Sequence, residues 1–229
     1  MQEAAVPRTL TRREEAAELG VFLLLVAPTL ALSFVDTGGS AVPFWLTAAA
    51  TIARDVGLVA LILLLLARDR QPVTVIGWAR RRIGRDVLIG LALSIPLVSG
   101  AQVLEAALRA AGLSSPSSAP GLTPSGPGEV VLAVVLVLVV AVAEETIFRG
   151  YLILRLTTVL RSRLWAVLAA SLIFAIGHGY EGEAAVVTIG LTGLVFAIVY
   201  VWRQSLVAPV VMHLVFNLLA IVVAPLLSS

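Results

Sequence analysis

Long apolar runs alternate with short polar connections along nearly the whole chain. Runs of about 17–25 residues have the length that a helix needs to cross a hydrocarbon core about 30 Å thick. The sequence therefore predicts an all-α fold, a polytopic membrane helix bundle of about seven transmembrane helices. The predicted spans are residues 19–35, 43–67, 86–111, 129–155, 164–180, 184–202 and 205–227.

The composition agrees with a protein embedded in a lipid bilayer. Hydrophobic residues make up 59% of the chain and charged residues 13%, with a mean hydropathy of +1.03. Soluble domains contain about 45–50% apolar and about 25% charged residues. No polar stretch is long enough to fold separately, so residues 1–229 are predicted to form one integral membrane domain. The chain has no cysteine, which excludes disulfides and a cysteine nucleophile.

The basic residues indicate an orientation rather than a nucleic-acid partner. The net charge is +2, but every basic residue is an arginine, and the arginines lie mostly at the edges of the predicted spans. The arginines fill alternate connections between the predicted spans, and Arg155 belongs to the fourth connection. No arginine lies in residues 36–42, 112–128 or 181–183. By the positive-inside rule, this alternation predicts a multi-pass protein of the inner (plasma) membrane, with residues 1–18 as a cytoplasmic N-terminal segment. The absence of lysine is a weak sign of a GC-rich, bacterial genome.

Two features in the first half of the chain leave alternatives open. Basic residues followed by an apolar run resemble a signal peptide, but Thr11 and Glu14 form a capping-box pattern that favours an uncleaved first helix. Arg54 and Asp55 interrupt the second predicted span. They indicate either a buried ion pair that faces the bundle or a misplaced helix boundary.

Two adjacent carboxylates, Glu144 and Glu145, follow a long uncharged run inside the fourth predicted span. An ionisable group at membrane depth is costly and is a functional-site hypothesis by default. Arg149 shares a helix face with Glu145, so these two residues are expected to form a structural ion pair. Glu144 points about 100° away and has no basic partner on its own helix, which leaves it free to act as a general base. Alternatively, both carboxylates lock helices together through buried pairs.

The only two histidines, His178 and His213, also lie in predicted spans, and Asn217 shares a helix face with His213. Each of these residues alone is more often a packed side chain or a hydrogen bond between helices. At about 1.5 Å of rise per residue, however, both histidines, Asn217 and Glu144 fall within about 10 Å of one membrane level. Their common depth favours a single catalytic or ligand-binding site.

This set of side chains suits the hydrolysis of an amide bond. A glutamate helped by a histidine can deprotonate water, and an imidazole and a carboxamide can donate hydrogen bonds to the oxyanion. The same atoms can instead hold zinc or another divalent metal, because Glu144, His178 and His213 would supply three ligands and leave one position for water. The His-Glu-x-x-His signature of soluble zinc proteases is absent. The sequence leaves metal-dependent and metal-free mechanisms open.

Three motifs resemble those of the CPBP family of intramembrane proteases, which includes type II CAAX prenyl endopeptidases and Abi-like proteins. Glu-Glu-x-x-x-Arg begins at Glu144, Phe-x-x-x-His ends at His178, and His-x-x-x-Asn begins at His213. The motifs occur in the family's order. The resemblance covers roughly residues 129–220, the predicted catalytic core helices. It implies a helix bundle around a conical intramembrane cavity that is open to the cytosol.

The resemblance also implies a role for each motif residue. Glu144 and His178 would activate water, His213 and Asn217 would bind the oxyanion, and the glutamate–arginine pair of the first motif would brace the site. The expected function is that of an intramembrane (metallo)endopeptidase that cleaves a membrane-associated protein or peptide. The alternative is a non-catalytic membrane scaffold or a binding protein of the bacteriocin-immunity type.

Overall fold

The computed structural model describes residues 8–34, 42–78, 82–114 and 123–228, and every regular element in these ranges is helical. Residues 1–7 of the predicted cytoplasmic segment lie outside the described residues. The all-α prediction is confirmed. The elements, with short 3-10 and π-helical segments written η, are α1 Arg12–Leu32, α2 Phe44–Arg68, η1 Val73–Ile76, α3 Ile83–Ala110, α4 Pro127–Glu144, η2 Glu145–Leu152, α5 Ile153–Leu160, α6 Arg163–Ile176, η3 Gly179–Glu181, α7 Glu183–Arg203, α8 Val207–Asn217, η4 Leu218–Val223 and α9 Ala224–Ser228.

Consecutive segments join into longer rods. α4, η2 and α5 form one continuous helix of 34 residues, Pro127–Leu160. Among the described residues, six helices are long and apolar enough to cross a membrane. The remaining predicted span is α6, which has only 14 residues. It ends at Ile176 instead of continuing to residue 180, because Gly177 and Gly179 follow and glycine is a poor helix former. The chain is therefore a multi-pass membrane protein with one shorter apolar helix.

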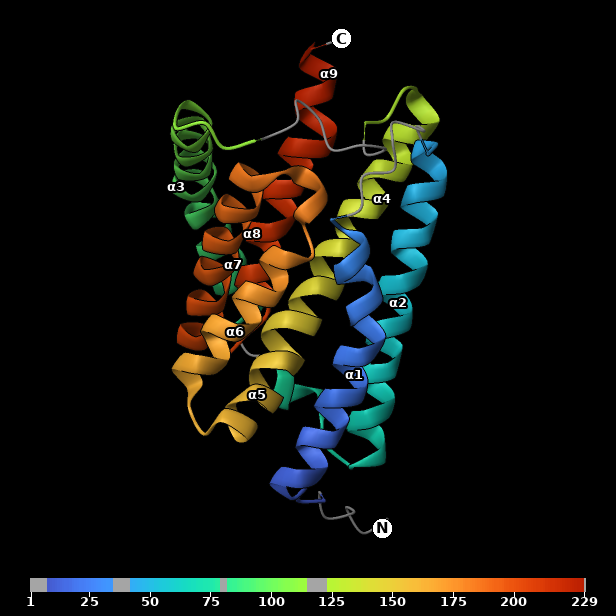
Figure 1. Ribbon diagram of the computed structural model, residues 1–229, viewed down its shortest axis with the longest axis vertical. Coiled ribbons are helices and arrows are strands. Elements are labelled where there is room, and N and C mark those ends of the chain that lie inside the picture. The colour runs from blue at the N-terminus through green and yellow to red at the C-terminus, as the bar shows by residue number, and fades with distance from the viewer. Residues whose placement is uncertain (1–7, 35–41, 79–81, 115–122, 229) are drawn as a thin grey trace.

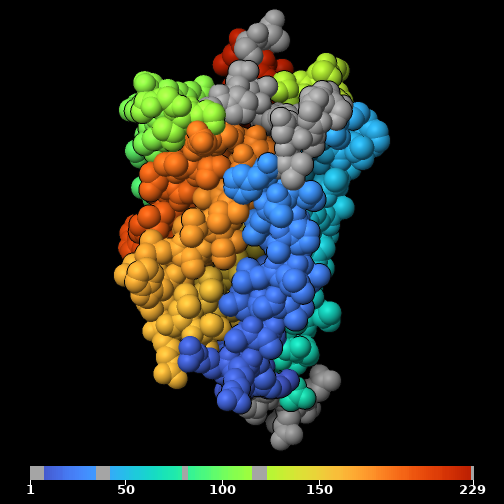
Figure 2. Space-filling view, viewed as in Figure 1, coloured from blue at the N-terminus to red at the C-terminus, as the bar shows by residue number. Residues whose placement is uncertain are grey.

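The α4–α5 rod runs through the centre of the bundle. In Figure 1, α1 and α2 lie on one side of this rod, and α3, α6, α7 and α8 lie on the other. α2 packs along α4, α1 along α5, and α6 against both α5 and α7, while α3 pairs with α8. The space-filling view shows α1 lying across this face, in front of the central rod (Figure 2). The Glu pair at the end of α4 is therefore enclosed by helices from both halves of the chain.

Apolar side chains form both the core and much of the outer surface. The main core cluster joins α1, α2, the central rod and α6 around Phe22, Tyr151 and Phe174. Soluble proteins rarely expose large contiguous apolar patches, whereas a bilayer covers them. Large side chains exposed on the outer faces include Leu24, Leu64, Leu88, Val131 and Leu172.

The first helix begins with the capping box that the sequence predicts. The Thr11 hydroxyl accepts a hydrogen bond from the backbone N–H of Glu14, and the Glu14 carboxylate accepts one from the backbone N–H of Thr11. This reciprocal cap satisfies two of the N–H groups that a helix start leaves without partners. α1 therefore starts at Arg12, several residues before the apolar run.

A second cluster of buried charges joins α1, α2 and α5. The sequence interpretation placed Arg155 in a basic connection, which is wrong: Arg155 lies inside α5 and is only 1% exposed. Its Nη2 lies 3.1 Å from Glu18 Oε2 and 3.9 Å from Asp69 Oδ2. Arg68 of α2 pairs with the same two carboxylates. A charge count along the chain cannot reveal that distant acids neutralise an arginine inside the bundle.

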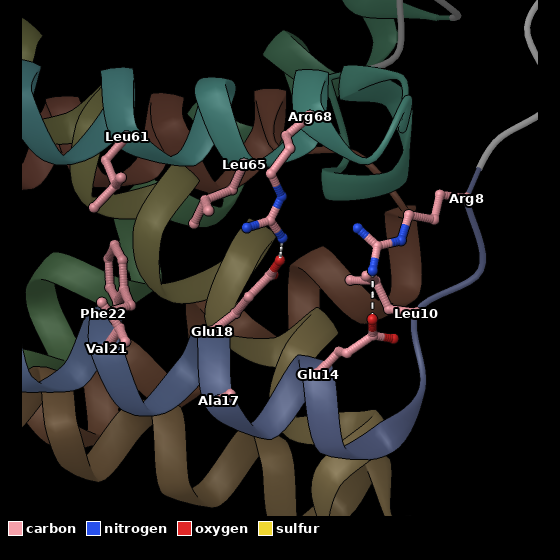
Figure 3. A pocket seen from close by; sticks show the side chains of 10 residues that line it. All are labelled: Arg8, Leu10, Glu14, Ala17, Glu18, Val21, Phe22, Leu61, Leu65 and Arg68. Carbon is pink, nitrogen blue, oxygen red and sulfur yellow. Dashed lines mark hydrogen bonds and ion pairs between the residues drawn. The ribbon is translucent and has the colours of Figure 1, made fainter.

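The same end of the bundle contains a pocket of about 410 Å³ between α1 and α2. As Figure 3 shows, its polar wall consists of two ion pairs, Arg8 with Glu14 and Arg68 with Glu18, beside apolar side chains of both helices. Each of the four charged residues that line it is already paired. The pocket shares no lining residue with the site described next.

Candidate functional site

The two adjacent carboxylates lie where the central rod changes its helical geometry. Glu144 is the last residue of α4, and Glu145 is the first residue of the π-helical segment η2. Both are buried, with 8% and 0% of their surface exposed. Short π-helical segments inside α-helices occur frequently at functional sites. A second π-helical segment, η4, begins directly after Asn217. The α4–α5 rod and the helix that contains α8 therefore both change geometry next to motif residues.

The ion pair expected from the first motif is present. Arg149 Nη1 lies 2.9 Å from Glu145 Oε1, and both side chains are at most 1% exposed. Arg149 also donates from Nη2 to the carbonyl oxygen of Gly193 in α7, at 3.0 Å. Its guanidinium carbon lies 4.3 Å from the ring centre of Phe174 and 5.3 Å from that of Phe196, within cation–π range. Arg149 thus connects the central rod to α6 and α7.

His213 of α8 joins the two carboxylates. Its Nδ1 lies 2.9 Å from Glu145 Oε1, and its Nε2 lies 3.8 Å from Glu144 Oε2. A carboxylate oxygen only accepts hydrogen bonds. Nδ1 is therefore the protonated ring nitrogen, and it donates a hydrogen bond to Glu145. A neutral His213 therefore presents Nε2 as an acceptor on the side of Glu144, and only the protonated ring donates from Nε2. The ring is 3% exposed and stacks on Phe196 at 5.3 Å between centres.

Glu144 has one oxygen near a cation and one without a hydrogen-bond partner. Its Oε1 lies 3.8 Å from Nη2 of Arg54, and its Oε2 is buried and forms no hydrogen bond with the described residues. Arg54 in turn pairs with Asp55 at 2.8 Å. These two residues of α2 therefore form an ion pair in which Asp55 is buried and Arg54 is partly exposed. The helix boundary was not misplaced, since α2 runs unbroken through them.

Arg54 and Asp55 stand out in the sequence, but the sequence did not predict that they lie at the site. The signal was two charged residues inside an apolar span, which is the same signal that identified the Glu pair. What the sequence lacked was the rotation of α2 relative to α4. That rotation is decided by how the two helices pack, and it directs Arg54 at Glu144.

His178 lies at the edge of the cluster. It lies two residues beyond the end of α6, after Gly177, and its Nδ1 donates to the carbonyl oxygen of Phe174 at 2.9 Å, which leaves Nε2 as an acceptor. Its ring lies 4.7 Å from the ring centre of Phe174, and the Phe174 ring in turn contacts His213 at 6.0 Å. The two imidazoles therefore flank one aromatic ring. Within the described ranges, no hydrogen bond or ion pair joins His178 to Glu144 or His213.

Asn217 lies one helical turn beyond His213, on the same face of α8. It is half-buried, and its side chain forms no hydrogen bond with another residue that the structure describes. The structure thus joins four of the six predicted residues directly and places the other two, His178 and Asn217, beside them. The directly joined residues are Glu144, Glu145, Arg149 and His213.

The described side chains do not form the cluster that a metal site requires. In these ranges, no group of three or more His, Cys, Asp or Glu side chains is arranged to hold a metal ion. Of the expected ligands, Glu144 and His213 approach each other, whereas no hydrogen bond or ion pair between described residues joins His178 to either of them. The arrangement does not fit the expected three-ligand set, so no step below is derived through a metal. Metal dependence stays a prediction.

The fold and the buried carboxylate–imidazole cluster define a polytopic helical membrane protein with a polar site enclosed in the bundle. Residues 126–219 match the family model described as type II CAAX prenyl endopeptidase Rce1-like. The match supports the resemblance to the CPBP family over these residues, and the matched range contains all three motifs. At the level of the family it supports a CAAX-protease-like membrane endopeptidase. Arg54 and Asp55 lie outside the matched range. No curated protein and no solved structure matches the chain.

Proposed function

We propose that the protein is an intramembrane endopeptidase that hydrolyses a peptide bond of a membrane-associated protein or peptide, with Glu144 as the general base. One observation carries the proposal: Glu144 Oε2 is buried without a hydrogen-bond partner and lies 3.8 Å from Nε2 of His213. A buried carboxylate oxygen without a partner is costly and calls for an explanation. A substrate water at this oxygen supplies one.

On this proposal, a single water molecule bridges the two atoms. The gap of 3.8 Å is too long for a direct hydrogen bond, and a water at about 2.8 Å from both atoms lies off the line that joins them. This water donates one hydrogen to Glu144 Oε2 and the other to the unprotonated Nε2 of His213. Both of its lone pairs then remain available to attack a carbonyl carbon.

The reaction follows from these contacts. Glu144 takes a proton from the water as the oxygen bonds to the carbonyl carbon, and the carbonyl electron pair moves onto its oxygen. Asn217 donates amide hydrogens to this oxyanion, while Nε2 of His213 accepts a hydrogen bond from the remaining hydrogen of the attacking water. Glu144 then gives its proton to the amide nitrogen, and the carbon–nitrogen bond breaks to a carboxylic acid and an amine. The part predicted for His178 in activating water stays a prediction, because both hydrogens of this water are donated to Glu144 and His213.

The ion pair of Glu145 and Arg149 keeps the catalytic side chains in position. Glu145 accepts from both Arg149 and His213, so the orientation of the imidazole depends on a carboxylate that Arg149 fixes. Orienting groups of this kind set the tautomer and direction of a catalytic histidine. We therefore assign Glu145 and Arg149 to positioning rather than to proton transfer.

The proposal is tested with purified protein in lipid nanodiscs and a library of membrane-binding peptides, both with and without a C-terminal prenyl group. We expect cleavage by the wild type and a loss of at least about 100-fold in Glu144→Gln, because general-base catalysis contributes about 10²–10⁴-fold. Glu129→Gln is the matched control, since Glu129 lies in the first turn of the same helix and, among the described residues, forms its hydrogen bonds with Ser125. It should cleave like the wild type.

The outcome also separates the two classes of function. Cleavage by Glu144→Gln at the wild-type rate would refute Glu144 as the base. Absence of cleavage by the wild type, together with an unchanged cellular phenotype in Glu144→Gln, would instead support the non-catalytic scaffold. Repeating the assay after chelation, with metal analysis of the same sample, decides the metal dependence.

A further inference from the structure

A charged pair from α2 lies beside Glu144, although it belongs to none of the three motifs. Arg54 Nη2 lies 3.8 Å from Glu144 Oε1, while its Nε and Nη2 both lie 2.8 Å from Oδ1 of Asp55. One guanidinium thus lies between two carboxylates from different helices. Placing two charged residues in the middle of an apolar span is costly, so their presence there suggests a function.

The exposed fraction of the side chain decreases from Arg54 to Glu144 to Asp55. The side chain of Arg54 is 37% exposed, that of Glu144 11% and that of Asp55 1%. Asp55 is enclosed and needs a cation, because a buried carboxylate without a partner is strongly unfavourable. Arg54 supplies this cation and bonds to Oδ1 of Asp55, while Oδ2 has no hydrogen-bond partner among the described residues. Nη2 of Arg54 also lies toward Glu144.

The two oxygens of Glu144 consequently have different neighbours. Oε1 faces Arg54, and Oε2 faces His213 without a hydrogen bond. A carboxylate that is free to rotate would exchange these two oxygens. The cation at Oε1 holds the carboxylate in one orientation, in which the unpartnered Oε2 is presented to the water.

We propose that Arg54 is a positioning residue for Glu144, and that Asp55 holds Arg54 in place. This inference rests on the proposed function, since it assigns Arg54 a role in the same hydrolysis. Arginine suits the role because its planar guanidinium offers five donors and can serve two carboxylates at once, whereas lysine carries one compact charge. The catalytic site therefore extends beyond the matched residues 126–219 into α2.

A purely structural role for the pair makes different predictions. A clamp between α2 and α4 would lower stability when removed and would leave the turnover of the folded protein unchanged. A residue that binds substrate would raise KM and leave kcat unchanged. A positioning residue lowers kcat with KM unchanged, because misplacing a catalytic group by about 1 Å costs about 100-fold in rate.

The first variant is the double substitution Arg54→Gln with Asp55→Asn. It removes both charges of the pair together, so Asp55 is not left as a buried carboxylate without its arginine. We expect a folded protein with kcat lowered about 100-fold and KM unchanged. Arg109→Ala serves as the control for loss of a membrane-span arginine, because Arg109 pairs with Glu105 far from the motif residues in the chain. It should retain wild-type kcat.

The second variant is Arg54→Ala assayed with added guanidinium ion. Arg54 is partly exposed, so the space that its side chain vacates is open to a small planar cation, and guanidinium should restore much of the lost kcat. Arg149→Ala is the matched control, because Arg149 is 1% exposed and enclosed by phenylalanine rings, and it should show no rescue. Arg54→Lys should give an intermediate kcat.

The outcomes are distinguishable. Low kcat in the double variant with guanidinium rescue of Arg54→Ala supports the positioning role. Wild-type kcat in the double variant, a change confined to KM, or the absence of rescue overturns that role while Glu144 remains the base. A wild type that cleaves no peptide overturns the proposed function and this inference together.

Discussion

Two buried clusters of carboxylates and arginines occur in this bundle, and they differ in one component. At the end formed by α1, α2 and α5, Glu18 and Asp69 face Arg68 and Arg155, which are permanent cations. At the centre, the carboxylates face arginines and also an imidazole, His213. Arginine only donates hydrogen bonds, whereas a neutral imidazole donates from one nitrogen and accepts at the other. On the proposed function, the first cluster holds helices together, whereas the second also orients and deprotonates the water.

The largest expected difference between the clusters is in activity. Glu144→Gln should lower the cleavage rate by at least about 100-fold without loss of thermal stability, because Arg54 keeps its pair with Asp55. Glu18→Gln should show the reverse, a lower melting temperature with normal activity per folded molecule, because Glu18 pairs with both Arg68 and Arg155. Thermal unfolding and peptide cleavage measured on the same samples check both. Equal loss of activity in the two variants would remove the distinction.

The next largest effect is in stability at the central cluster. Arg149→Met keeps the side-chain volume but leaves Glu145 buried without its arginine, and we expect a loss of about 3–5 kcal/mol. Replacing Glu145 by Gln in the same chain should recover part of this loss, because no unpaired charge remains. Thermal unfolding in detergent measures both variants. An unchanged melting temperature in Arg149→Met would contradict the bracing role.

At the end cluster, Arg155→Met should lower stability by roughly 3 kcal/mol, because it leaves buried carboxylate oxygens with fewer donors. Arg68 remains beside Glu18 and Asp69, so the effect should be smaller than that of Arg149→Met. Activity per folded molecule should not change. A fall in kcat would show that this end of the bundle communicates with the site.

The smallest effect concerns a close contact between α7 and the central cluster. A Cβ atom at Gly193 would lie 2.7 Å from Phe174 Cδ1 and 2.8 Å from Arg149 Nη2. Gly193→Ala should therefore destabilise the protein by about 1–3 kcal/mol through overpacking, and it should also lower activity because Phe174 lies between the two imidazoles. Gly57→Ala is the control, since its Cβ would meet nothing within 4 Å. A melting temperature for Gly193→Ala equal to that of the control would contradict this packing.

The sequence predicted much of the fold because membrane helices follow directly from apolar run length. The predicted span 43–67 agrees closely with α2, and the predicted span 184–202 with α7. The π-helical segment after Glu144 was not predictable, since it depends on packing between helices rather than on local propensity. The burial of Arg155 was missed for a related reason. Its partners lie more than eighty residues away along the chain.

For the site, contacts within one helix were predictable from the sequence, whereas contacts between helices were not. The spacing of Glu145 and Arg149 predicted their ion pair, because residues four apart share a face. The contact between His213 and Glu145, and that between Arg54 and Glu144, depend on how separate helices are rotated. A common depth in the membrane indicated that these residues belong together. It did not reveal which atoms meet.

A high-resolution experimental structure of the protein in lipid tests the central claim most directly. The account predicts one ordered water within hydrogen-bond distance, about 3.2 Å or less, of both Glu144 Oε2 and His213 Nε2. In Glu144→Gln this water should be lost or displaced. A Glu144 side chain paired directly with a basic residue at Oε2, with packed apolar side chains in place of the water, would contradict the proposed hydrolysis.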